Sequence, residues 1–161
     1  MPITPLHFGV LAPINHYAKG KVNNLSFMLV NLLIDLKSII YGLTGYGAID
    51  HAGAHNFFGV LIPIFIIGLL WFWRKEWWLG AILGGFSHVA LDMLVHSDME
   101  PFHPVLSGNP FYLGLMEPLS LVLFGLCGWL IAQYVSNILA ICQKILVVAS
   151  AWKLRLFGAI R

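Results

Sequence analysis

The sequence predicts an all-α membrane protein: a polytopic transmembrane helix bundle with four to six membrane helices and an amphipathic C-terminal helix. Composition is the first reason. Of the 161 residues, 59% are hydrophobic and only 10% are charged, and the mean hydropathy is +0.83. These values are typical of polytopic membrane proteins and exclude an ordinary soluble domain.

The second reason is the length of the apolar runs, since about 20 residues cross the ~30 Å hydrocarbon layer. Tryptophan and tyrosine stand at several ends of these runs, as expected at membrane interfaces. The four runs that approach this length are residues 24–43, 55–73, 77–97 and 112–134.

The two ends of the chain are predicted separately. Residues 3–18 are apolar but short and contain prolines, so they are expected to form a short first span, a re-entrant helix or an interfacial helix. Residues 137–161 mix apolar with basic residues, which favours an amphipathic helix on an anionic membrane surface. A further span over 137–152 is the alternative. The predicted division is therefore a transmembrane domain, 1–136, and a C-terminal membrane-surface helix, 137–161.

Basic residues predict the orientation. Lysine and arginine precede the first long run, separate the second from the third, and follow the fourth. The loops at 44–54 and 98–111 contain neither. By the positive-inside rule, the basic segments face the cytoplasm and these two loops face the periplasm or the cell exterior.

Histidine and aspartate residues lie within or beside these apolar runs, where an ionisable group is costly and is by default a functional hypothesis. His88, Asp92 and His96 are four residues apart and share one helix face. His51 and His55 form a second such pair. With the predicted orientation, these side chains and Asp35 lie between mid-membrane and the outer surface.

Imidazole and carboxylate groups on facing helices of a bundle are typical of buried metal sites. This donor set favours zinc, manganese or iron over calcium or magnesium. Two other interpretations stay open: a purely structural polar network, and a proton or ion pathway.

Several motifs resemble a known family. They are TPLHFG near the N-terminus, the aspartate in NLLIDL, DHAGAHN, and GGFSHVALDMLVHSD followed by PFHP and NPF. Over about residues 1–112 they resemble the YdjM/DUF457-type proteins of the bacterial inner membrane, which are often labelled membrane-bound metal-dependent hydrolases. That family is remotely similar to the zinc-dependent phospholipase C and P1 nuclease group. The resemblance implies a multi-pass protein of the bacterial inner membrane.

The resemblance also implies a ligand set. One or two zinc ions, with manganese or iron as alternatives, would be bound by His7, Asp35, His55, His88 and Asp92. His51 would be a further ligand or the acid/base, and we assign His51 and Asp98 as candidate catalytic residues. His96 joins the metal ligands through its helical spacing. Lys37 stands where the family often has a second acid, which bears on the number of ions.

The expected function is hydrolysis of a lipid phosphoester at the outer leaflet. The partner would be a membrane lipid or a lipid-linked substrate, with no nucleic acid, and a homo-oligomer is left open. Two alternatives use the same residues: an ion or proton transporter, and a non-catalytic scaffold whose helices are pinned together by metal.

Overall fold

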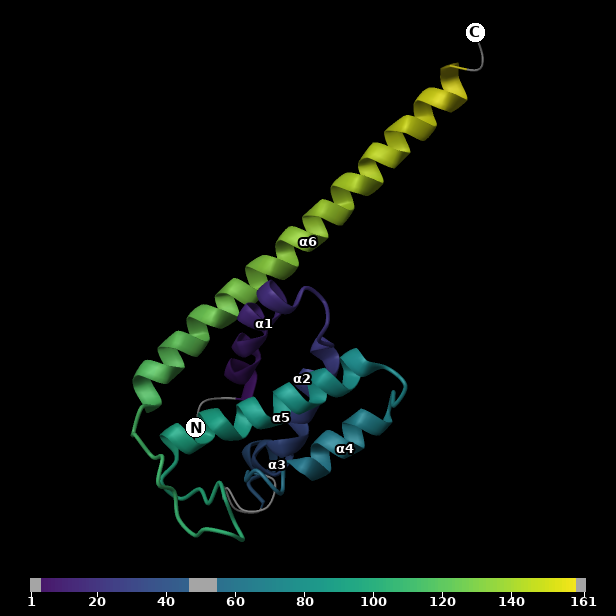
Figure 1. Ribbon diagram of the computed structural model, residues 1–161. Helices are drawn as coiled ribbons and strands as arrows, with labels where there is room; N and C mark the ends of the chain where they lie inside the picture. Colours follow the sequence, from purple (N-terminus) through teal and green to yellow (C-terminus); the bar gives the residue numbers. More distant parts are fainter. Residues whose placement is uncertain (1–3, 47–54, 159–161) are drawn as a thin grey trace.

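The fold is known from a computed structural model that describes residues 4–46 and 55–158, with side chains for 5–46 and 55–146. Within these ranges the chain forms helices, turns and loops and no β-strand, which confirms the all-α class. The elements are the 3-10 helix η1 (Thr4–Val10) and the α-helices α1 (Leu11–Ala18), α2 (Asn24–Ile34), α3 (Leu36–Thr44), α4 (Leu61–Leu69), α5 (Lys75–Val95) and α6 (Met116–Gly158) (Figure 1).

Two helices are long and apolar enough to cross a membrane: α5 in full, and α6 over Met116–Leu146. Helices α2 and α3 would add a third span if the bent pair is counted as one. The part of the chain that the structure describes thus holds fewer membrane helices than the four to six predicted.

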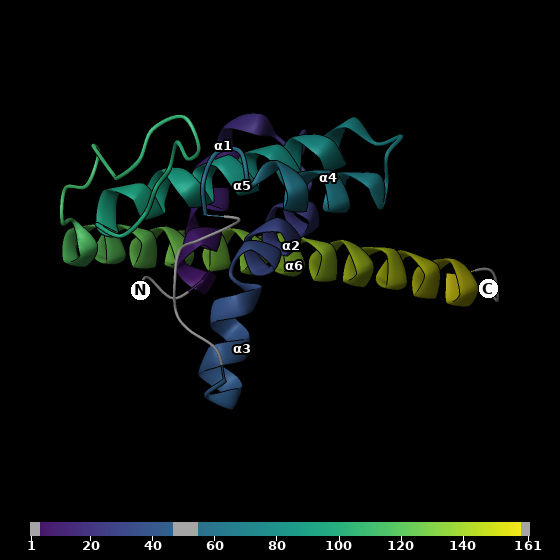
Figure 2. The same cartoon turned by 90° about the horizontal axis from the view of Figure 1, so that it is seen from below.

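The predicted span at 24–43 is bent by 60° at Asp35. Asn23 caps the start of α2 by accepting a hydrogen bond from the Ser26 amide at 2.9 Å. At Asp35 the backbone leaves helical geometry, in keeping with the low helix propensity of aspartate. Beyond it, α3 has no buried residue and projects away from the other helices (Figure 2).

The predicted span at 55–73 contains only the nine-residue helix α4, with turns on both sides. Tertiary hydrogen bonds account for its end. The Trp77 indole donates to the Ile67 carbonyl, and the Trp78 indole donates to the Phe72 carbonyl at 3.0 Å. These indoles satisfy carbonyls that a longer helix would have bonded internally.

Helices α2 and α5 run parallel and in close contact, with α4 against both. Glycines on α5 allow this approach: a Cβ atom at Gly84 would lie 2.6 Å from the Phe27 carbonyl oxygen, and one at Gly80 would collide with Asn23 and Ser26. Small residues one turn apart are a common basis for helix contact in membranes. The buried core between these helices includes Val30, Ile34, Val60, Ile64, Ile67, Trp77, Ala81 and Val89.

The N-terminal segment packs against α6. Gly9 faces the α6 backbone near Leu123, and Gln133 donates to the Ala12 carbonyl at 3.0 Å. Helix α6 is uninterrupted over 43 residues, so the predicted boundary at residue 136 falls inside one helix. At 1.5 Å per residue it is about 65 Å long, and its C-terminal part extends well beyond the other helices (Figure 1).

The two ends of the bundle differ in charge. At one end, the turn after α1 meets the turn before α5, where the Asn23 amide donates to the Glu76 carbonyl at 2.9 Å. Both turns are basic in sequence, and we call this the basic end. At the other end, the Asn109 side chain donates to the carbonyls of Met93 and His96 at 2.7 and 2.8 Å and ties the loop 98–111 to the end of α5.

This arrangement makes the predicted orientation testable. In a chain with Cys127 and Cys142 replaced by serine, a cysteine at the exposed Ser107 should react with an impermeant thiol reagent added to intact cells. One at the exposed Glu76 should react only after permeabilisation. The reverse labelling pattern would place the loop 98–111 in the cytoplasm and contradict the orientation.

Candidate metal centre

Four side chains that are far apart in sequence converge between α2, α4 and α5: Asp35, His55, His88 and Asp92. One nitrogen or oxygen atom from each lies within 4.8 Å of the others, and all four residues are buried. This His/Asp cluster could hold a metal ion.

Short contacts join the cluster. His55 Nε2 lies 3.0 Å from Asp35 Oδ1. His88 Nε2 lies 3.3 Å from Asp35 Oδ1 and 3.1 Å from Asp92 Oδ2. Each imidazole thus faces carboxylate oxygen from a distant part of the chain.

The fold explains the convergence. The bend after α2 places Asp35 at the end of that helix, and the parallel packing of α2 and α5 brings this end level with the fourth and fifth turns of α5. His88 and Asp92 are one turn apart on α5, as their spacing predicted. His55 lies just before α4 and closes the cluster.

The two buried carboxylates give the cluster negative charge that must be balanced. Asp35 and Asp92 are only 5% and 3% exposed, so their carboxylates have little water to stabilise their charges. Like charges at this separation repel strongly in a medium of low dielectric constant. A cation, whether a metal ion or protonated histidine, is needed to balance them.

Asn31 determines which ring nitrogen of His88 faces the carboxylates. Its amide nitrogen donates to the carbonyls of Phe27 at 2.8 Å and Gly84 at 3.3 Å, which fixes the orientation of the amide. Its oxygen therefore faces His88 Nδ1 at 2.9 Å and can only accept. The proton of His88 is thereby assigned to Nδ1.

His88 Nε2 is left as the ligand atom. It is fully buried and has no hydrogen-bond partner among the described residues, although two carboxylates lie within 3.3 Å. An N–H at this atom would be poorly aligned for a hydrogen bond to either oxygen, so a protonated imidazole would be held by charge attraction more than by hydrogen bonds. A lone pair facing carboxylates is repulsive unless a cation lies among them, and the arrangement fits a bound metal ion.

His7 and His96 lie on the other side of Asp92. His7 Nε2 is 3.2 Å from Asp92 Oδ1, and the His7 ring stacks on His88 with centroids 4.3 Å apart. His96 Nε2 is 4.0 Å from the same oxygen. Both are buried, so they border the cluster without belonging to the tight group of four.

The structure describes only one of the two predicted catalytic residues. His51 lies outside the described residues. Asp98 is exposed in the loop after α5, and its role stays a prediction. Lys37, at the position of the family's second acid, is exposed on α3 and adds no carboxylate to the group of four.

Sequence reasoning gave Asn31 no role in the site. One signal was present: Asn31 precedes Asp35 by four residues and so shares its helix face. A buried amide on that face would have been a candidate to orient a metal-binding histidine.

Comparison of the chain with protein-family models, with curated proteins and with solved structures gave no match. The resemblance to the inner-membrane hydrolase family therefore stays a prediction that rests on the quoted motifs.

Proposed function

We propose that this chain is an integral membrane metal-dependent hydrolase that acts on a lipid phosphoester at the outer leaflet. The supporting observation is the buried cluster of two carboxylates and two imidazoles, in which one ring nitrogen faces carboxylate oxygens without a hydrogen bond. The metal would be bound by Asp35, His55, His88 and Asp92.

The donor set supports zinc, with manganese or iron as alternatives. Two imidazole nitrogens and two carboxylate oxygens are donor types that zinc binds, and a coordinated water would take a fifth position. Two carboxylates with neutral imidazoles carry a charge of about −2, which a divalent ion balances.

The contacts of Asp92 support a second metal-binding position. Its Oδ2 faces His88, while its Oδ1 faces His7 and His96. A carboxylate with imidazoles on both oxygens is suited to bridge two ions. We therefore propose one ion at the group of four and a second, weaker position at His7 and His96.

A bound divalent cation supplies Lewis acidity, polarising a phosphoryl oxygen and acidifying a coordinated water. The chain's own residues fix the geometry. Asn31 orients His88, and the stacked rings of His7 and His88 limit the access of water to that side. While the second metal position is empty, His7, whose Nε2 lies 3.2 Å from Asp92 Oδ1, would accept or return a proton beside Asp92.

The choice of a lipid phosphoester follows from depth and charge. The cluster lies towards the C-terminal end of α5, away from the basic end, where a lipid ester would approach from the outer headgroup layer. The loop at 98–111 contains no lysine or arginine, so metal rather than side chains would neutralise the phosphate.

The proposal predicts phospholipid turnover that depends on the cluster. Protein purified with a histidine-free tag and loaded with zinc should release a phosphorylated headgroup or a diacylglycerol from liposomes. Asp35→Asn should abolish the release because the substitution removes a ligand charge, and the matched control His16→Ala, exposed and distant from the cluster, should retain it.

Three other outcomes would contradict the hydrolase. Metal bound without turnover of any phospholipid would indicate a scaffold. Proton or ion flux without turnover would indicate a transporter. Turnover that survives Asp35→Asn would place the activity elsewhere.

A further inference from the structure

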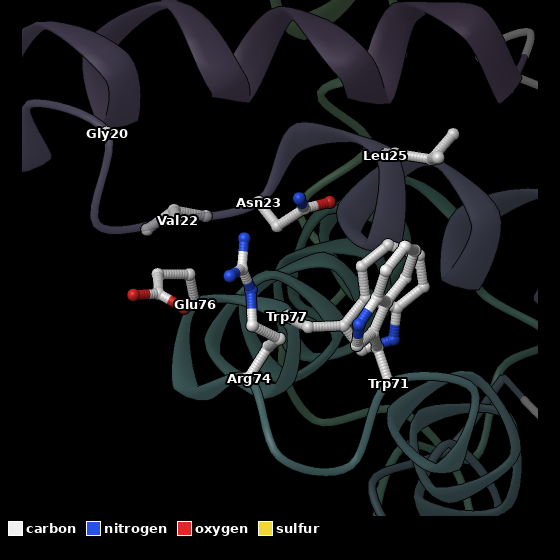
Figure 3. A pocket seen from close by; sticks show the side chains of 8 residues that line it. All are labelled: Gly20, Val22, Asn23, Leu25, Trp71, Arg74, Glu76 and Trp77. Carbon is white, nitrogen blue, oxygen red and sulfur yellow. The ribbon is translucent and has the colours of Figure 1, made fainter.

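A cavity of about 380 Å³ lies at the basic end, between the turn that follows α1 and the turn that joins α4 to α5. It is separate from the His/Asp cluster, which lies three to four turns further along α5. Figure 3 shows its lining, which includes Val22, Asn23, Trp71, Arg74, Glu76 and Trp77.

Arg74 gives the cavity its charge. Its guanidinium points towards Asn23, while the Glu76 carboxylate points away from it (Figure 3). Within the described part of the chain no ion pair engages Arg74. Its planar fork of donors is suited to a phosphate group, which it can bind through two parallel hydrogen bonds.

Tryptophan forms the opposite side. The rings of Trp71 and Trp77 lie together, with centroids 5.7 Å apart, and line the cavity (Figure 3). Tryptophan is enriched at the depth of lipid headgroups, where one end of the ring is apolar and the other is wet. The cavity therefore offers an apolar wall beside a cationic one.

The surroundings add positive potential. Lys19 and Lys21 lie on the turn after α1, and Lys75 follows Arg74; all three are exposed. Basic pockets between membrane helices on the cytoplasmic side attract anionic lipid headgroups. The volume is within the range of small-molecule sites and accommodates a phosphate with its glycerol.

We propose that this cavity binds the phosphate of an anionic phospholipid headgroup, at the membrane face opposite the His/Asp cluster. Arg74 pairs with the phosphate and the tryptophan rings contact the glycerol and the first acyl carbons. The site is independent of the proposed hydrolase, because it shares no residue with the cluster.

Lipid binding can be measured by quenching of tryptophan fluorescence in neutral detergent micelles. Brominated phosphatidylglycerol should quench the full chain at lower concentration than brominated phosphatidylcholine. Arg74→Gln should weaken the phosphatidylglycerol effect by about tenfold or more, as expected for loss of a charge-assisted pair. Lys75→Gln removes the same charge from the neighbouring residue, which does not line the cavity. This variant should change the phosphatidylglycerol concentration needed for quenching by less than about twofold.

Glu76→Gln and the metal content act as further controls. Glu76→Gln removes the one carboxylate of the lining and should leave binding equal or tighter. Metal content should be unchanged in Arg74→Gln, which separates loss of the cavity from loss of the fold.

Two results would overturn the proposal. Equal losses in Arg74→Gln and Lys75→Gln would indicate diffuse attraction to the basic surface rather than a site. Displacement of phosphatidylglycerol by millimolar inorganic phosphate or glycerol phosphate would assign the cavity to a soluble phosphate ester instead of a lipid.

Discussion

Asp92→Asn is expected to remove bound metal while the protein stays folded in the membrane. Asparagine has nearly the size of aspartate, and an amide costs less than a carboxylate in hydrocarbon, so insertion should be kept. What is lost is a negative charge whose two oxygens face His88 on one side and His7 on the other. Metal analysis of protein purified without chelator should show about one equivalent or more in the wild type and background in Asp92→Asn.

Two further variants sharpen this experiment. His88→Ala should also reduce metal to background, and the double variant should be little worse than either single one, because ligands of one ion act as a unit. His16→Ala removes an exposed imidazole near Trp129 at the other end of the molecule and should be silent. Equal metal content in the wild type and Asp92→Asn would decide against the hydrolase and leave the transporter or the scaffold.

The sequence predicted the chemistry of the site better than the lengths of its helices. The spacing of His88 and Asp92 was enough to predict that they share one helix face, because α5 is a regular helix through both residues. Asp35 and His55 were placed in the same membrane layer by the predicted orientation, and the resembled family then implied that they are ligands of the same site. The structure now supplies a physical reason for grouping the four residues, because their two buried carboxylates need a cation to balance their charge.

The missed helix ends have tertiary causes. Hydropathy over 55–73 counts apolar residues and cannot register that the indoles of Trp77 and Trp78, on the next helix, take the carbonyls at the end of α4. At the bend, Asp35 contacts a buried partner, His55, that a hydropathy count cannot register either. A separate element was expected from residue 137, but α6 continues through this position, and the exposed Lys144 does not interrupt it.

The second large effect is expected on zinc affinity when Asn31 is substituted. This substitution tests whether the proton of His88 is on Nδ1. Asn31→Leu removes the oxygen that accepts from His88 Nδ1 and the amide nitrogen that donates to the carbonyls of Phe27 and Gly84. The affinity for zinc should then fall by about 10- to 100-fold, the usual cost of losing a group that orients a metal-binding histidine. Titration with zinc against a competing chelator measures this, and saturating zinc should still restore full occupancy because all four ligands remain.

Asn31→Asp separates orientation from simple packing. A carboxylate still accepts from Nδ1 and makes the imidazole a stronger ligand, so zinc affinity should stay within a few-fold of the wild type although the donations from the Asn31 amide to the two carbonyls are lost. If leucine and aspartate weaken zinc equally, Asn31 acts through its bonds to α2 and α5. If leucine leaves the affinity unchanged, Nδ1 does not carry the proton, and the case for an unprotonated Nε2 facing the carboxylates is lost.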